Sequence, residues 1–303
     1  MKKDLRIRNS LIYIFLAFFS LIITPIVYKN LPRESRIYIR QYFYKAKVTS
    51  QLILDSKFRV LDKCNIKEID NVPKNATLIV GHAYGDPYRP SSFINQNLYK
   101  FIDKNRSRIS TIIFTGDVFG NGTKSNWYKL DSSFGDDFEI IVAPGNHDIT
   151  NNGTPDKNVF KETRFGRKEF PFSLKRNGVN LIIDDSTVNN GVIIKKTIDL
   201  VNNSKEYENI LLRHHMPVIE FELIANNREN ENHLPSMKKL SKLFNKKIII
   251  ISGDSGAFDH LPRITCRSLN NIVMIANGIG DHPDDQVIIL SKGNLYRHRF
   301  NNN

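Results

Sequence analysis

Four short polar segments each carry residue types that bind metal ions or move protons. They are Gly81–Gly85 (GHAYG), Gly116–Gly120 (GDVFG), Gly145–Asp148 (GNHD) and Arg213–Pro217 (RHHMP). The third segment follows the apolar run Glu139–Ala143, which is typical of a buried strand. A cluster of Asn, His and Asp at the end of such a strand lies where α/β sheets bind ligands.

The same context recurs at four other places in the chain. Apolar or β-branched runs directly precede His82, Asp117, His214 and Asp254, and these runs are Thr77–Val80, Thr111–Phe114, Ile210–Leu212 and Lys247–Ser252. A single Asp at a strand end is usually a turn former. Five strand ends that carry Asp, Asn or His indicate side chains that converge on one metal cluster.

The order of these motifs resembles that of the calcineurin-like metallophosphoesterases, over about residues 73 to 303. That family carries Asp-x-His, Gly-Asp, Gly-Asn-His-Asp or -Glu, a His shortly before Pro, and Gly-His-x-His. Gly116-Asp117 and Gly145–Asp148 match without change, and His214–Pro217 matches well. The resemblance implies a four-layer α/β/β/α sandwich and divalent metal ions, two per domain, of Mn, Fe or Zn.

The first and last motifs depart from the family pattern. Aligned on the glycine, His82 stands where the family has Asp, and Tyr84 stands where it has His. In the last motif, Asp254 replaces the first His, and Gly256 leaves the second ligand position empty. In the alternative register His82 keeps the family's His position and Val80 replaces the Asp. Imidazole, carboxylate and phenolate can all bind first-row metals.

The resemblance implies a role for each matching residue. Asp117 would bridge two ions, Asn146 and Asp254 would bind one of them together with His214 or His215, and His82 and Tyr84 would bind the other. The second position is short of ligands. Asp86, Asp259 and His260 are the candidates to fill it, and the sequence does not choose between them.

The expected catalytic residues are His147 and Asp148. A metal-bound hydroxide would attack phosphorus, and His147 would stabilise the transition state or protonate the leaving oxygen, with Asp148 orienting its ring. The expected substrate is a phosphomonoester or phosphodiester. A lipid or an envelope glycan precursor is one candidate source. The altered motifs also fit a catalytically inactive relative that serves as a binding module.

A second feature is the amino terminus. Residues 1–10 are basic, and Leu11–Tyr28 contains eighteen residues without a charge. As a helix this run is about 27 Å long, enough to cross a hydrocarbon core. No small-residue cleavage site follows it, which favours an uncleaved single-pass anchor over a cleaved signal peptide or a buried helix.

Residues 29–71 form an expected basic, aromatic linker. The first fifty residues hold ten basic and two acidic side chains, so they carry +8 of the net charge of +13. Such a segment next to an apolar run favours a membrane surface over nucleic acid. Basic residues flank the run on both sides, so the positive-inside rule leaves its orientation open.

Residues 72–303 have the length of one large α/β domain. Helices are expected at residues 90–103, 195–203 and 234–244, hairpins at 170–183 and 286–300, and substrate-facing loops at 121–137 and 149–167. Cys64 and Cys266 are too few for a disulfide framework, although they could form one bridge in an oxidising compartment. The chain has neither a P-loop nor a Gly-x-Ser-x-Gly elbow, which argues against an ATPase and a serine hydrolase.

Overall fold

A computed structural model of the chain divides into two compact units, Met1–Gln51 and Leu52–Asn303. The structure describes residues 66–151, 154–188, 191–215, 230–254, 257 and 263–300, together with a few residues of the first unit between 28 and 39. Among the helices so described, none is both long and apolar enough to cross a membrane. Apart from Tyr28, the expected anchor Leu11–Tyr28 lies outside the described residues.

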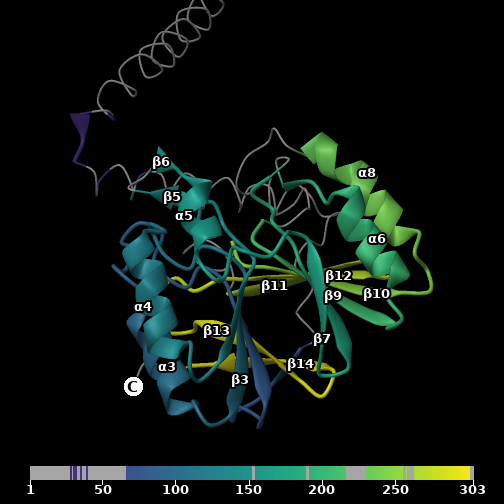
Figure 1. Cartoon of the computed structure of the whole chain (residues 1–303), viewed down its shortest axis with the longest axis horizontal. Coiled ribbons are helices and arrows are strands. Elements are labelled where there is room, and N and C mark those ends of the chain that lie inside the picture. The colour runs from purple at the N-terminus through teal and green to yellow at the C-terminus, as the bar shows by residue number, and fades with distance from the viewer. Residues whose placement is uncertain are drawn as a thin grey trace, which may run out of the picture. The chain divides into compact units, whose positions relative to one another are not determined.

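The second unit contains two six-stranded sheets of mixed direction (Figure 1). The first sheet has the order β1-β14-β13-β2-β3-β4. Its strands are β1 (Lys67–Glu68), β2 (Ala76–Val80), β3 (Ile109–Phe114), β4 (Glu139–Val142), β13 (Gln286–Ser291) and β14 (Asn294–Arg299). The second sheet has the order β11-β12-β10-β9-β8-β7. Its strands are β7 (Phe172–Arg176), β8 (Val179–Ile183), β9 (Glu208–Arg213), β10 (Lys247–Ser252), β11 (Ile264–Leu269) and β12 (Ile272–Asn277).

The central strands are buried on both faces, because alternate side chains of a strand point to opposite sides of its sheet. Ile249 and Ile251 of β10 face the core between the sheets, where they join Ile113 of β3. Ile248 and Ile250 face the opposite way, toward the helices. Burial on both faces explains why β10 reads as a continuous apolar run.

Helices cover the outer face of each sheet (Figure 1). On the first sheet they are α3 (Gln96–Lys104), α4 (Lys124–Phe134) and α5 (Lys157–Glu162), and on the second α6 (Lys195–Asn203) and α8 (Asn230–Ser241). A small hairpin of β5 (Thr150–Asn151) and β6 (Thr154–Pro155) precedes α5. These layers agree with the expected α/β fold.

Several expectations about local structure are wrong. Residues 149–167 are not simply a loop, because they contain the β5–β6 hairpin and α5. Residues 121–137 are not simply a loop, because Thr123 caps α4 by accepting a hydrogen bond from the backbone N–H of Asn126. Helix α3 begins at Gln96 rather than at Pro90, because the Asn95 side chain caps it at Leu98. Side-chain caps of this kind fix the first turn of a helix.

Cys266 in β11 is disulfide-bonded. The other cysteine of the chain, Cys64, lies outside the described residues.

Candidate metal centre

Both sheets contribute side chains to one cluster at the carboxyl ends of their parallel strands. From the first sheet come His82 after β2, Asp117 after β3 and His147 after β4; from the second come His214 and His215 after β9, and Asp254 after β10. The carboxyl edge of parallel strands is the usual ligand site of α/β sheets. The sequence motifs therefore meet in space as their strand ends predicted.

The turns after β2 and β3 take an unusual backbone conformation. His82 and Asp117 both have a φ of 52°, in the left-handed region that residues other than glycine rarely occupy. Gly116, before Asp117, has no room for a side chain, since a Cβ atom would lie 2.5 Å from the His214 ring. Strained residues of this kind persist where surrounding structure holds them, and they cluster at functional sites.

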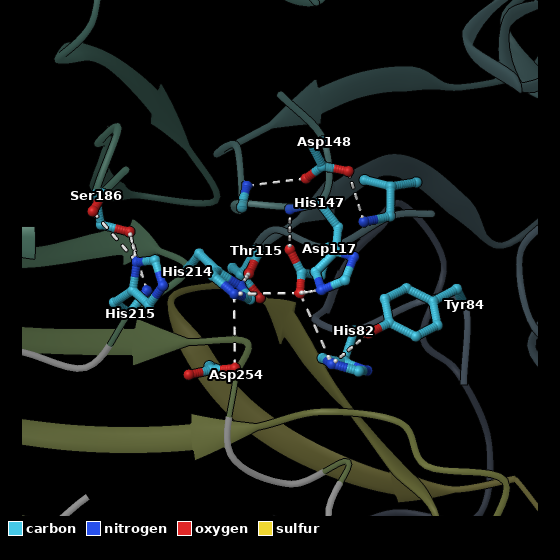
Figure 2. Close-up of polar contacts among 12 residues, drawn as sticks. His82, Tyr84, Thr115, Asp117, His147, Asp148, Ser186, His214, His215 and Asp254 are labelled. Atoms are coloured by element: carbon cyan, nitrogen blue, oxygen red, sulfur yellow. Dashed lines mark hydrogen bonds and ion pairs between the residues drawn. The ribbon is translucent and has the colours of Figure 1, made fainter. Parts of the chain in front are cut away.

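The carboxylate of Asp117 lies at the centre of the cluster (Figure 2). Its Oδ2 atom is 3.4 Å from Nε2 of His214, 3.8 Å from Nε2 of His82 and 4.0 Å from Nε2 of His147. Its Oδ1 atom accepts a hydrogen bond from the backbone N–H of His147 at 3.1 Å. One buried oxygen therefore faces three imidazole nitrogens.

Each histidine of the cluster is held by a backbone carbonyl at its Nδ1 atom. The pairs are His82 with Gly85 at 3.0 Å, His147 with Gly120 at 2.9 Å, His214 with Thr115 at 3.2 Å, and His215 with Ser186 at 3.2 Å. A carbonyl oxygen only accepts, so Nδ1 carries the proton and Nε2 has the lone pair in the neutral ring. Metal-binding histidines are usually oriented in this way.

The residues present fit a divalent cation. Two groups of residues could each hold an ion, because the ligand atoms within each group all lie within 4.8 Å of one another. One group is His214, His215 and Asp254, and the other is His82, Asp117 and Asp254. Among the described residues, Nε2 of His214 is buried without a hydrogen-bond partner. It faces Asp254 Oδ1 at 3.6 Å as well as Asp117. This combination of a lone pair and two carboxylates favours a positive charge between them.

The electrostatics of the cluster support this assignment. Burial would lower the pKa of His214, but Asp117 and Asp254 raise it above its ordinary value. Burial would raise the pKa of Asp117, but His214, His147 and His82 hold it below its ordinary value. Burial lowers the pKa of His82, although Asp117 and Asp254 oppose this effect. Asp117 thus stays ionised and His82 stays neutral, which are the forms that bind metals. The raised pKa of His214, in contrast, shows that Asp117 and Asp254 hold a positive charge at its ring, a place that a proton fills without metal and that a metal ion would take over.

Tyr84 lies beside His82 and is buried (Figure 2). Because Nδ1 of His82 is the protonated nitrogen, the Tyr84 hydroxyl donates to Nε2 of His82, at 3.0 Å. Burial and the neighbouring carboxylates, Asp117 foremost, raise the pKa of Tyr84 above its ordinary value. Tyr84 is therefore a neutral phenol in this arrangement rather than a phenolate.

Asp148 holds two of the loops together. Its Oδ1 atom accepts from the backbone N–H of Val118 at 2.8 Å, and its Oδ2 atom accepts from that of Gly145 at 2.9 Å. Burial and then Asp117 raise the pKa of Asp148 to about 7. The ring of His147 is oriented by Gly120, so the contribution of Asp148 is to position the loops that carry Asp117 and His147.

The remaining residues that the sequence suggested as metal ligands do not belong to the two described groups. The side chain of Asn146 is exposed at the tip of its turn. The Asp86 carboxylate binds Arg89 at 3.1 Å and the backbone N–H of Tyr88 at 2.8 Å. Asp259, His260 and Gly256 lie outside the described residues.

Sequence reasoning did not identify three supporting residues. Ser186 follows β8 and its hydroxyl accepts from the backbone N–H of His215 at 2.9 Å. Asp184 and Arg213 form a buried ion pair at 3.4 Å directly before the His214 loop. Asp184 and Ser186 follow β8, which pairs with β9 in a parallel direction. Their position at the end of a strand is the signal that could have indicated them.

A family model described as calcineurin-like phosphoesterase matches residues 83–278. The chain belongs to this family, which confirms the resemblance seen in its motifs. No curated protein matches the chain. The family consists of metal-dependent phosphoesterases, and the cluster around Asp117 supplies His and Asp groups that could bind the metal.

Proposed function

We propose that this protein hydrolyses a phosphomonoester or a phosphodiester with the help of divalent metal, such as Mn, Fe or Zn. One observation carries the proposal: Asp117 Oδ2 faces the Nε2 atoms of His82, His147 and His214, and each ring is fixed at Nδ1 by a backbone carbonyl. A backbone carbonyl would satisfy a buried imidazole N–H in a structural cluster as well, but here the three carbonyls turn three Nε2 atoms toward one carboxylate. That shared direction is the arrangement that a metal- and phosphate-binding centre needs.

Bound metal would polarise a phosphoryl oxygen and lower the pKa of a bound water. The residues of the chain would do the rest. His147 is the most open histidine of those around Asp117, with 41% of its side chain exposed. In the doubly protonated ring, Nδ1 keeps its hydrogen bond to Gly120 and the Nε2–H group is suited to binding a phosphoryl oxygen and to giving its proton to the leaving oxygen. Its fixed Nδ1 atom keeps it in that orientation.

We further propose that the full chain is anchored to a membrane by Leu11–Tyr28, with one pass. The support is the length of this uncharged run and the basic residues on either side of it. An anchored phosphoesterase would meet substrates at the membrane surface, such as a phosphorylated lipid or an envelope glycan precursor. Nucleic acid is not an expected substrate.

The test is to purify the full chain in detergent, to count its bound metal by elemental analysis, and to assay a panel of phosphate esters before and after chelation. Expected are bound metal and a chelator-sensitive release of phosphate or of alcohol from at least one ester class. Bound metal without turnover of any ester would instead support the inactive binding module. Absence of both would contradict the proposal.

A further inference from the structure

The two groups of candidate ligands are unequal. The atoms around His214 Nε2 lie at 3.4 Å (Asp117 Oδ2) and 3.6 Å (Asp254 Oδ1). Two donor atoms that share one first-row ion at about 2.1 Å lie about 3.0 to 3.5 Å apart. The pairs at His214 nearly meet this spacing before any ion binds, and His215 adds a further ring nitrogen within the same group.

The group at His82 is weaker in two respects. Its pair with Asp117 is longer, at 3.8 Å. Its third member, Asp254, already belongs to the first group, so that the two groups compete for the same carboxylate. Asp117 belongs to this group, but its Oδ2 atom lies closer to His214 Nε2 than to His82 Nε2, at 3.4 Å against 3.8 Å.

The lone pair of His82 is also engaged. Nδ1 donates to Gly85, so Nε2 accepts the hydroxyl proton of Tyr84, which is 3.0 Å away (Figure 2). Tyr84 is 1% exposed, and its ring packs 4.3 Å from that of His82 and 5.6 Å from that of His147, measured between centroids. A second ion at His82 would have to break this hydrogen bond and leave a buried hydroxyl without its acceptor, which is unfavourable.

We propose that the centre holds one ion, bound by His214, Asp117 and Asp254 with His215 beside them, and that the Tyr84–His82 pair takes the place of a second ion. The inference rests on the proposed metal-dependent function and departs from the two ions that the family resemblance implies. In the one-ion centre, the Tyr84–His82 pair fills the place beside the Asp117 carboxylate with a closed, neutral hydrogen bond, where a second ion would supply charge.

The number of ions can be measured without any substrate. The full chain, stripped by a chelator, is reconstituted with increasing Mn²⁺, and bound manganese is counted by elemental analysis and examined by electron paramagnetic resonance. One ion per chain with the signal of an isolated Mn²⁺ is expected. Two ions with a spin-coupled signal would overturn the inference and leave the proposed function intact. A chain that binds no ion would overturn the proposed function as well.

Substitutions at single residues test which side chains determine the number of bound ions. His214→Gln should abolish binding, whereas His82→Gln should keep one ion with an affinity within a few-fold of the parent. Loss of the ion in His82→Gln, or its retention in His214→Gln, would contradict the assignment. Tyr84→Phe frees the His82 lone pair and should admit a second, weaker ion, and Tyr99→Phe on α3 is the matched control. A single ion in both tyrosine variants would contradict the role given to Tyr84.

Discussion

Gly81 and Gly253 meet backbone to backbone, where the turn after β2 in one sheet touches the turn after β10 in the other. A Cβ atom on Gly81 would lie 2.1 Å from the Cα atom of Gly253. The contact lies immediately beside His82 and Asp254, so it sets how closely the two halves of the metal centre approach each other. Glycine is required here for lack of space, because the opposing atoms are main-chain atoms that cannot rotate away.

Gly81→Ala should therefore destabilise the protein by more than about 3 kcal/mol, since overpacking against backbone forces the turns apart. Gly178→Ala is the control. Gly178 has a φ of 82°, and a Cβ atom added there would have no neighbour within 4 Å, so only about 1 kcal/mol of backbone strain is expected. Denaturant unfolding of both variants measures the difference, and equal losses would argue against the close contact.

Asp117→Ala should remove both bound metal and turnover. Asp117 is the carboxylate that faces all three Nε2 atoms, and its loss would leave Asp254 as the one carboxylate in the two described ligand groups. Elemental analysis and the phosphate-ester assay are the measurements. Near-normal turnover by this variant on an ester that the parent hydrolyses would show that the reaction occurs elsewhere.

His147→Ala should separate catalysis from metal binding. Turnover should fall by about 10²- to 10⁴-fold, which is typical of a positioned acid or base, while metal content stays near that of the parent. His298→Ala is the matched control, because His298 also donates from Nδ1 to a carbonyl, that of Ile69, but lies on β14. Loss of metal in His147→Ala would place His147 among the ligands.

Asp285 should make stability depend on pH. It accepts from the backbone N–H groups of Gly280 and His282, and burial raises its pKa to about 6. The unfolded chain binds this proton only below about pH 3.9, so the folded state holds more protons between those values and loses stability as pH rises through them. Unfolding from pH 4 to 7 should show a loss of stability in the parent that is smaller by up to about 3 kcal/mol in Asp285→Asn, where Asp148 still contributes its own loss. Parallel curves would contradict the buried acid.

The full chain should remain in the membrane fraction through high-salt and carbonate washes if Leu11–Tyr28 spans the bilayer. Adhesion through the basic residues of segment 29–71 alone would be released, because salt screens exposed charges beyond about 3 Å at 1 M. A chain that begins at Gln51 should leave the membrane and keep its activity on small soluble esters. A shortened amino terminus near residue 30 would indicate a cleaved signal instead.

The sequence predicted the strands of the site well because these strands are buried on both faces. In runs such as Lys247–Ser252 the interior residues are all apolar, which is typical of a strand buried on both faces. Strand β10 has the same bounds. The helix α4 was missed because its surface is polar. Its apolar residues Trp127, Leu130 and Phe134 are nevertheless spaced along one helical face, and Thr123 precedes them as a cap.

Within the site, the sequence named the residues but not their partners. The carbonyl groups that orient the histidines belong to the backbone, so no pattern of side chains predicts them. The hydrogen bond from Tyr84 to His82 forms at a left-handed turn, a conformation that is uncommon for residues other than glycine and that the motif does not predict. Asp148 likewise binds amides of two loops, which no spacing rule predicts.

The candidate metal ligands come from both sheets, with Asp117 on one and His214 and Asp254 on the other. An ion bound to all three would therefore act as a cross-link between the two sheets at the carboxyl ends of their strands. Its binding energy adds to the free energy of unfolding, by about 2.7 kcal/mol when the free ion is at 100 times its dissociation constant. The fraction of protein molecules that are folded would then rise and fall with the concentration of free metal. Chelation would lower the melting temperature even without substrate.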